Sequence, residues 1–152
     1  MNESIRQVYG TLLDLVVLMN QPQRDSALLR EAGVNLDRAL FPLLVTIGRK
    51  GPIGVVELAN QTGRDYTTVS RQVAKLESLG LIVRRPSAAD KRVSEASITE
   101  QGLEMTARID AARERIATQL FASWSEEEVQ TLVRLLRRFA EEFAALPTAE
   151  QP

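Results

Sequence analysis

The sequence predicts a mainly α-helical fold with one small β-hairpin near the middle of the chain. Apolar residues recur at helical spacing through most of the 152 residues. Only residues 81–98 combine two β-prone runs with a polar loop between them. A hydrophobic content of 44% at this length is enough to bury a core without a disulfide. We therefore expect one intertwined domain with long helices at its two ends.

The chain contains no cysteine and no histidine, which excludes several functional classes. It removes disulfides, thiol chemistry, imidazole bases and the usual ligands of zinc. Acidic groups such as Glu126–Glu128 fall in the first turn of an expected helix, so an enzyme, a metal and a cofactor are not expected. No secretory signal and no apolar run of membrane-spanning length is present. We expect a cytoplasmic protein without a membrane partner.

Both ends of the chain are expected to form helices that are too apolar for the surface of a monomer. Residues 4–20 carry a wide apolar stripe. Ser125 and Glu128 have the spacing of a capping box that opens the last helix, which carries Phe139 and Phe143 on its apolar side. A single chain offers no obvious cover for either helix. We therefore predict a homodimer that is joined through the N- and C-terminal helices.

Residues 21–50 are expected to connect the first helix to the central part of the chain. Pro22 breaks the first helix, and residues 26–35 are interpreted as a short helical turn and connector. Residues 36–48 return to helical spacing, but Pro42 interrupts them. Either Pro42 kinks this helix or the regular part begins close to Phe41.

Residues 51–63 show the first half of a helix-turn-helix pattern. Residues 51–54 are interpreted as a turn, and Gly54 offers only a weak cap for a short helix over residues 55–61. Ala59 is small enough for a close approach of helices, and Gly63 permits the tight turn that follows.

The second helix of the pattern lies between Gly63 and Gly80. Asp65 can cap its start, and Gly80 suits a left-handed end. Its apolar residues form one stripe: Val69, Val73, Leu76 and Leu79. Thr67, Thr68, Ser70, Arg71 and Lys75 project elsewhere, so this helix is expected to pack on one face and to lie on DNA with the other.

The hairpin is expected to form a wing beside this helix. Residues 81–85 and 93–98 are the two strands, and residues 86–91 form the loop. Asp90 stands two residues before Arg92, so its carboxylate can hold the guanidinium in one pose for a minor groove. The alternative is an ordinary ion pair on a solvated hairpin.

The basic charge is concentrated in this central region. The whole chain has a formal net charge of −1, whereas residues 63–92 hold seven basic and three acidic residues, a net charge of +4. Such a basic centre is expected where only the middle of a chain contacts phosphate. A solvated basic face is the alternative.

A long helix is expected from Thr99 to about Leu120. Its spacing predicts a buried side made of Leu103, Ile109, Ala112, Ile116 and Leu120.

The order of elements and several short motifs resemble the MarR family of bacterial transcription regulators. The matching residues are Gly51-Pro52, Glu57-Leu58-Ala59, Gly63, Thr68-Val69-Ser70-Arg71, Leu76-Glu77, Gly80-Leu81-Ile82, Arg84-Arg85, Asp90-Lys91-Arg92 and Thr99-Glu100-Gln101-Gly102. The resemblance covers nearly the whole chain. It implies a winged helix-turn-helix dimer with recognition helices in successive major grooves and wing tips in flanking minor grooves.

The resemblance also implies an organisation and a function. Residues 1–35 would be an N-terminal dimerisation helix and connector, residues 36–98 the DNA-binding lobe, and residues 99–152 the C-terminal dimerisation helices. The function would be that of a dimeric repressor on a pseudo-palindromic DNA operator, released by a small organic effector such as a lipophilic anion. Whether it represses or activates depends on operator position. The alternative is a dimeric protein-interaction module without sequence-specific DNA binding.

The family's DNA contacts carry over to ten residues of this chain. The resemblance places base reading on Thr67, Thr68 and Arg71, and phosphate contacts on Arg64, Ser70, Lys75, Arg84 and Lys91, with Arg85 as a further basic candidate. Arg92 would enter the minor groove, with Asp90 as its brace. Tyr66 either stacks on a sugar or covers the turn.

Overall fold

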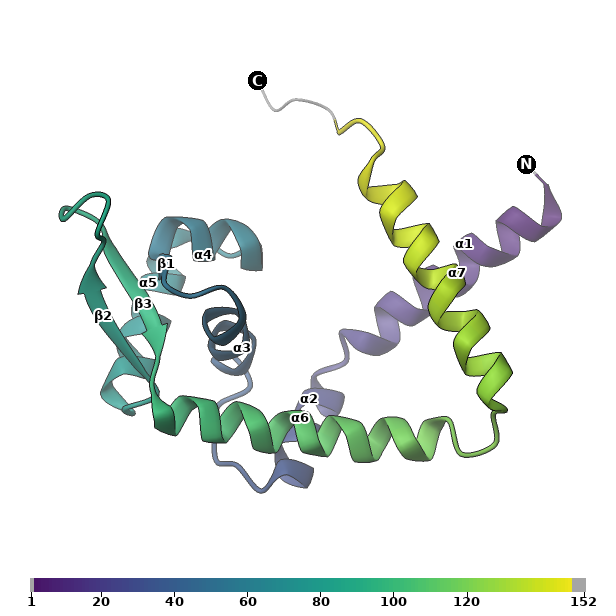
Figure 1. The fold of residues 1–152 in the computed structure, drawn as a ribbon, viewed down its shortest axis with the longest axis horizontal. Helices are drawn as coiled ribbons and strands as arrows, with labels where there is room; N and C mark the ends of the chain where they lie inside the picture. The colour runs from purple at the N-terminus through teal and green to yellow at the C-terminus, as the bar shows by residue number, and fades with distance from the viewer. Residues whose placement is uncertain (1, 149–152) are drawn as a thin grey trace. The chain divides into compact units, whose positions relative to one another are not determined.

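The computed structural model, drawn in Figure 1, describes residues 2–148. The chain divides into two compact units. The units are Met1–Arg113 and Glu114–Pro152. The division into residues 1–35, 36–98 and 99–152 stays a prediction. Met1 and residues 149–152 of those segments lie outside the described residues.

The first unit begins with two helices rather than with one helix and a connector. α1 (Glu3–Met19) starts at Asn2, whose Oδ1 accepts a 2.9 Å hydrogen bond from the Ser4 amide. α2 (Pro22–Ala32) follows directly, so the helix is longer than the short helical turn predicted over residues 26–35, and only residues 33–35 form a connector. Proline at the first helical position loses no intrahelical hydrogen bond, and Pro22 therefore opens α2 while it ends α1.

α3 (Phe41–Lys50) supplies the centre of the core. Pro42 lies in its first turn, which confirms the late helix start near Phe41. The side chains that it buries are Phe41, Leu43, Leu44 and Ile47.

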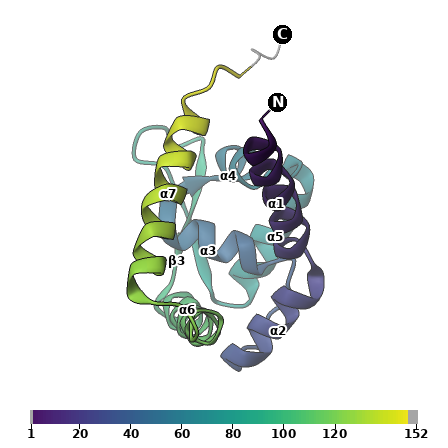
Figure 2. The same cartoon turned by 90° about the vertical axis from the view of Figure 1, so that its right-hand side faces the viewer.

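The predicted helix-turn-helix is confirmed. α4 (Val55–Thr62) ends at Gly63, whose φ of 65° lies in the left-handed region that glycine adopts without strain. α5 (Tyr66–Ser78) follows α4 after three residues and packs on α3 and α4 (Figure 2). Val69, Val73 and Leu76 of α5 are fully buried.

Leu79 does not belong to this buried stripe. It is 41% exposed because α5 ends at Ser78, so Leu79 no longer follows the helical face. Gly80, with φ at 74°, then turns the chain into the next strand, as predicted.

A three-stranded antiparallel sheet completes the lobe. β2 (Ile82–Pro86) and β3 (Ser94–Ile98) form the predicted hairpin, with Ile82 opposite Ile98 and Pro86 opposite Ser94. β1 (Ile53–Gly54) adds to the free edge of β3, which gives the order β1-β3-β2. The sequence interpretation of residues 51–54 as a turn missed this strand, because two residues show no alternation.

α6 (Glu100–Leu120) follows the hairpin, and its predicted buried side is only partly correct. Ile109 and Ala112 are fully buried. Leu103, Ile116 and Leu120 are 52%, 42% and 66% exposed, so their predicted burial within the chain was wrong. The spacing identifies an apolar stripe, but it does not identify the surface that covers it.

α7 (Glu126–Ala144) opens with the predicted capping box. The Glu128 amide donates to Ser125 Oγ at 3.1 Å, and the Ser125 amide donates to Glu128 Oε2 at 2.8 Å. The rings of Phe139 and Phe143 stack on its exposed apolar side, with their centroids 5.9 Å apart. α1 also buries none of its side chains. Both terminal helices thus leave apolar faces uncovered within one chain.

None of the helices within residues 2–148 has the length and hydropathy that a membrane span requires.

The start of α6 is hydrogen-bonded to the residue that follows Leu79 and packs closely against the hairpin. Thr99 Oγ1 donates to the Gly80 carbonyl at 2.7 Å and accepts from the Gly102 amide at 3.1 Å. A Cβ at Gly102 would collide with the Leu81 carbonyl oxygen and lie 2.6 Å from Ile98 Cγ1. Gly102 therefore permits a close approach of helix to sheet that no larger residue allows.

We expect Gly102→Ala to lower the free energy of unfolding by about 1–3 kcal/mol, the usual cost of overpacking a core. Chemical denaturation of the purified protein measures it. Glu104→Ala changes an exposed position of the same helix and should have little effect. Equal stabilities of the two variants would contradict the close approach.

Candidate nucleic-acid interface

One side of α5 is exposed along its length. Thr67, Arg71 and Lys75 lie one turn apart on this side and are exposed. Ser70 is half-buried beside them. The burial of the opposite face fixes the direction in which these side chains project.

Asp65 caps α5, as predicted, and also accepts the hydrogen bond that the Thr68 hydroxyl donates. Its Oδ1 accepts from the Thr68 amide at 2.9 Å, and its Oδ2 accepts from Thr68 Oγ1 at 2.6 Å. These bonds, the side-chain bond above all, lower the pKa of Asp65. The cap is therefore complete above the ordinary pKa range of a carboxyl group and is lost as pH falls through the lowered value. Toward a base, Thr68 Oγ1 retains only its acceptor capacity.

Arg64 is held within the protein. Its Nη1 donates to the Ala39 carbonyl at 2.6 Å and to Gln72 Oε1 at 2.9 Å, and the side chain is half-buried. This places Arg64 between α5 and the segment before α3. The phosphate contact expected of Arg64 stays a prediction, and the structure gives this side chain an internal role.

Arg84 also bonds within the protein, to Glu77, and this contact joins β2 to α5. Its Nη2 donates to Glu77 Oε1 at 3.0 Å, and its amide donates to Glu77 Oε2 at 3.2 Å. The hydrogen bond between the two side chains lowers the pKa of Glu77 and raises the pKa of Arg84. Exposed pairs of this kind contribute little to stability, but this one joins the hairpin to α5.

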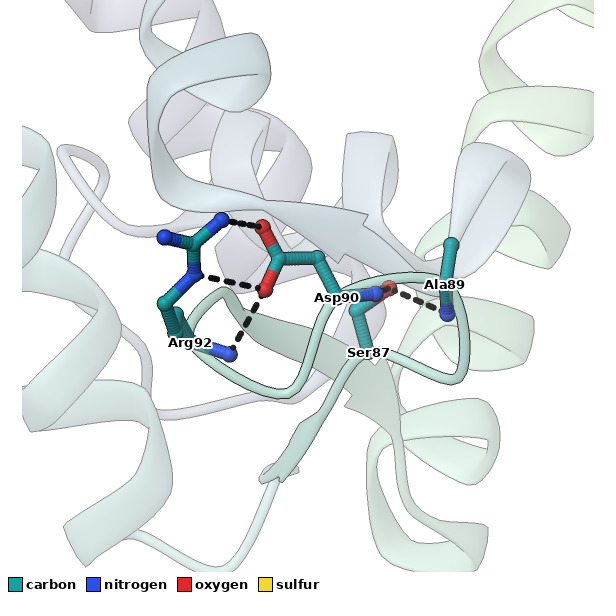
Figure 3. A network of polar contacts seen from close by, with 4 residues as sticks. All are labelled: Ser87, Ala89, Asp90 and Arg92. Carbon is teal, nitrogen blue, oxygen red and sulfur yellow. Dashed lines mark hydrogen bonds and ion pairs between the residues drawn. The ribbon is translucent and has the colours of Figure 1, made fainter.

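The tip of the hairpin holds the predicted brace (Figure 3). Arg92 Nε donates to Asp90 Oδ1 and Nη2 donates to Asp90 Oδ2, both at 3.1 Å. The Arg92 amide also donates to Asp90 Oδ1 at 3.0 Å. The Arg92 side chain is nevertheless 91% exposed. The guanidinium is therefore oriented by its neighbour and open to a ligand.

This brace lowers the pKa of Asp90, through the side-chain bond to Arg92 first and the backbone bond second. Asp90 stays ionised above the ordinary carboxyl range, and the brace is lost only as pH falls through the lowered pKa.

Ser87 is a wing residue that the sequence reasoning missed. It is buried, and its Oγ accepts from the amides of Ala89 and Asp90 at 3.2 and 3.5 Å (Figure 3). A serine that opens a polar loop is a typical former of such local turns, which is the signal that could have identified it. Ser87 fixes the backbone that carries Asp90.

The remaining candidate residues lie on the hairpin or at the start of α5. Arg85 and Lys91 are exposed on the hairpin. Tyr66 is 56% exposed. With Arg92 and Val93 it lines a surface hollow of about 390 Å³ between the start of α5 and the wing. All ten predicted site residues thus lie in the first unit, on α5, the turn before it or the hairpin.

A second hollow of about 450 Å³ lies between α3 and α6. Val45, Gly48 and Leu103 contribute apolar surface, and Arg49 and Arg113 contribute positive charge. Asp110 lines the same hollow and pairs with Arg113 at 2.7 Å. Within residues 2–148 no cluster of three or more acidic side chains could hold a metal ion.

Known structures share this fold over nearly the whole chain. A MarR family protein from Bacillus stearothermophilus superposes with a TM-score of 0.80 at 24% identity, over 95% of this chain and 99% of that one. The crystal structure of MarR gives a TM-score of 0.70 at 28% identity, over 91% and 98% of the two chains.

Relatives by sequence agree with these structures. Residues 36–94 match the MarR family. YxaD of Bacillus subtilis, an uncharacterized HTH-type transcriptional regulator, is 35% identical over 109 residues, which are 72% of this chain and 76% of YxaD. IacR of Pseudomonas putida, an HTH-type transcriptional repressor, is 26% identical over 68% of this chain and 62% of IacR. The chain belongs to the MarR family, whose members are transcription regulators and not enzymes.

Proposed function

We propose that the protein is a dimeric repressor that binds a pseudo-palindromic DNA operator in the cytoplasm and is released by a small-molecule effector. The observation that carries the proposal is the pairing, on one compact unit, of an exposed polar face of α5 with the braced Arg92 of the wing. The likeness to the repressor IacR supports the direction of control.

In this proposal α5 reads bases in the major groove. Arg71 is exposed, and an arginine can donate two hydrogen bonds to guanine, which discriminates against other bases by about 1–3 kcal/mol. Thr67 offers a hydroxyl beside it, and Thr68 offers an acceptor. Ser70 and Lys75, at the margins of this face, bind phosphate and fix the register.

The wing binds the neighbouring minor groove through Arg92. Asp90 already holds this guanidinium in one pose, so less side-chain entropy is lost when DNA binds. Lys91 and Arg85 contact the phosphates on either side.

Two copies of the chain are required for a palindromic site. The uncovered apolar faces of α1 and α7 provide the surface through which the copies join. Recognition helices of such dimers enter major grooves one helical turn apart, about 34–36 Å.

The hollow between α3 and α6 is the proposed effector site. Its apolar lining beside Arg49 suits a small lipophilic anion, since Arg113 is already paired with Asp110 of the same lining. An effector that prefers a non-binding conformation by about 2.7 kcal/mol lowers DNA affinity about a hundredfold. No cofactor or metal takes part in this mechanism.

A mobility-shift experiment tests the proposal. The probe is the DNA just upstream of the protein's own gene, in the presence of nonspecific competitor. Retention of a complex that competitor does not displace is expected. Loss of the complex in proportion to the competitor would contradict sequence-specific binding.

We expect Arg71→Ala and Arg92→Ala to weaken binding in different ways. Arg71→Ala should lower affinity and relax the preference at one base pair of each half-site, whereas Arg92→Ala should weaken all related sequences alike. Fluorescence anisotropy on a set of single-base operator variants measures both effects. Sequence-independent losses of equal size would rule out these roles.

Asp90→Ala distinguishes two effects of Asp90 on DNA affinity, its orientation of Arg92 and its negative charge. The substitution removes a negative charge beside DNA, so electrostatics alone predicts tighter binding. Because the brace is lost, we expect binding to weaken by about two- to tenfold instead. Affinity titrations at fixed salt decide the sign, with Glu95→Ala, a half-buried acidic residue of β3, as the control for charge.

Affinity is expected to fall steeply with salt. Each phosphate that the protein neutralises should contribute about 0.9 log unit of affinity per log unit of salt concentration. Binding constants measured over a range of salt concentrations give the slope. A flat dependence would favour a protein-interaction module.

Phe139→Glu is expected to break the dimer, because it places a charge on the exposed apolar face of α7. Sedimentation velocity should show a monomer where the unmodified protein is a dimer, and DNA binding should be lost. Arg137→Gln changes the net charge by the same amount on the same helix and serves as the control. A dimeric Phe139→Glu variant would place the interface elsewhere.

A further inference from the structure

We propose that Gln72 is a base-reading residue that selects guanine, and that Arg64 is the residue that positions its side-chain amide. The inference rests on the proposed function, since it concerns sequence-specific binding of DNA by α5.

The position of Arg64 is fixed from the side of the core. Its Nη1 donates to the carbonyl of Ala39 at 2.6 Å. The Ala39 amide donates in turn to Asp37 Oδ1 at 2.8 Å, and the Leu40 amide donates to the Asp37 carbonyl at 2.9 Å. Leu40 is buried in the core. The turn over residues 37–40 is therefore an anchored support for the guanidinium.

Arg64 determines which way the amide of Gln72 faces. A guanidinium group has only hydrogen-bond donors, so the atom that meets Nη1 at 2.9 Å must be the oxygen Oε1. The nitrogen Nε2 then lies on the other side of the amide with two N–H groups. Within residues 2–148 no acceptor bonds to these N–H groups. Gln72 consequently presents a pair of donors.

These donors lie at the edge of the face that is proposed to read DNA. Gln72 is half-buried, next in sequence to the exposed Arg71 and one turn from Lys75. The three side chains border a surface hollow of about 230 Å³ together with Asp37, Ala39 and Leu40. An amide in this position can meet a base edge beside the one that Arg71 contacts.

A pair of donors favours one base in the major groove. Guanine presents two neighbouring acceptors, N7 and O6, whereas adenine presents the acceptor N7 and the donor group at N6. The usual pairing of glutamine with adenine requires the amide oxygen to accept from N6. The bond from Arg64 does not exhaust that oxygen, but it keeps the oxygen turned toward Arg64 and prevents the amide from turning it toward N6 of adenine. The N–H groups of Nε2 then find two acceptors on guanine and only N7 on adenine.

The experiment first selects operators from random DNA with the full-length protein. Guanine is then replaced by adenine at each position of a half-site, and the ratio of the two affinities is measured. We expect one position, apart from the one that depends on Arg71, where guanine is favoured by about tenfold. The ratio is the readout because any change in overall charge affects both sequences alike.

Gln72→Glu retains the oxygen that accepts from Arg64 and removes both N–H donors. We expect it to abolish the guanine preference at that one position and nowhere else. Arg64→Met retains the length of the side chain and removes the donors, so the amide is free to turn and the ratio should move toward adenine. Arg64→Lys retains a donor and should restore part of the guanine preference.

The outcomes separate this inference from the function on which it rests. If the protein selects an operator and Gln72→Glu leaves every ratio unchanged, the role of Gln72 is overturned and the proposed function stands. If Arg64→Met lowers affinity without moving the ratio, the positioning role of Arg64 is overturned. If Arg64→Met does not fold, Gln72→Glu and Arg64→Lys decide. A protein that selects no sequence overturns both proposals.

Discussion

The burial of one stripe of α5 is the constraint on which the candidate interface depends. Val69, Val73 and Leu76 are each fully buried, and burial of a side chain of this kind contributes about 1.5–3 kcal/mol. Any rotation of α5 about its axis would expose part of this stripe to water. The polar side chains on the opposite face therefore project outward as a consequence of the packing. The packing of α5 alone thus orients the face that is proposed to bind DNA.

A second group of contacts keeps the wing in register with this helix. Glu77 and Arg84 join α5 to β2, and Thr99 ties the end of β3 to the Gly80 carbonyl that follows α5. The absence of a side chain at Gly102 lets α6 close on the same junction. These contacts join the helix to the hairpin, so the position of the proposed wing contact depends on that of the proposed major-groove contact.

Local patterns in the sequence were sufficient to predict the helix caps, the helix-turn-helix and the tip of the hairpin. The caps at Asp65 and Ser125 and the brace of Asp90 on Arg92 depend on residues two or three apart, so spacing alone predicts them. Contacts between distant segments left no such trace. The bond from Arg64 to Ala39 spans 25 residues, and β1 is too short to show a period. The exposure of Leu103 shows the same limit, because a stripe does not reveal its partner.

In the proposed complex, α5 and the wing of each copy contact DNA at the same time and in different grooves. Hydroxyl-radical footprinting of the selected operator, with the unmodified protein and with Arg92→Ala, tests it most directly. We expect protection at the two half-sites and at the minor grooves that flank them, with only the flanking protections lost in Arg92→Ala. Uniform fading of all protections, or no change in any of them, would contradict it.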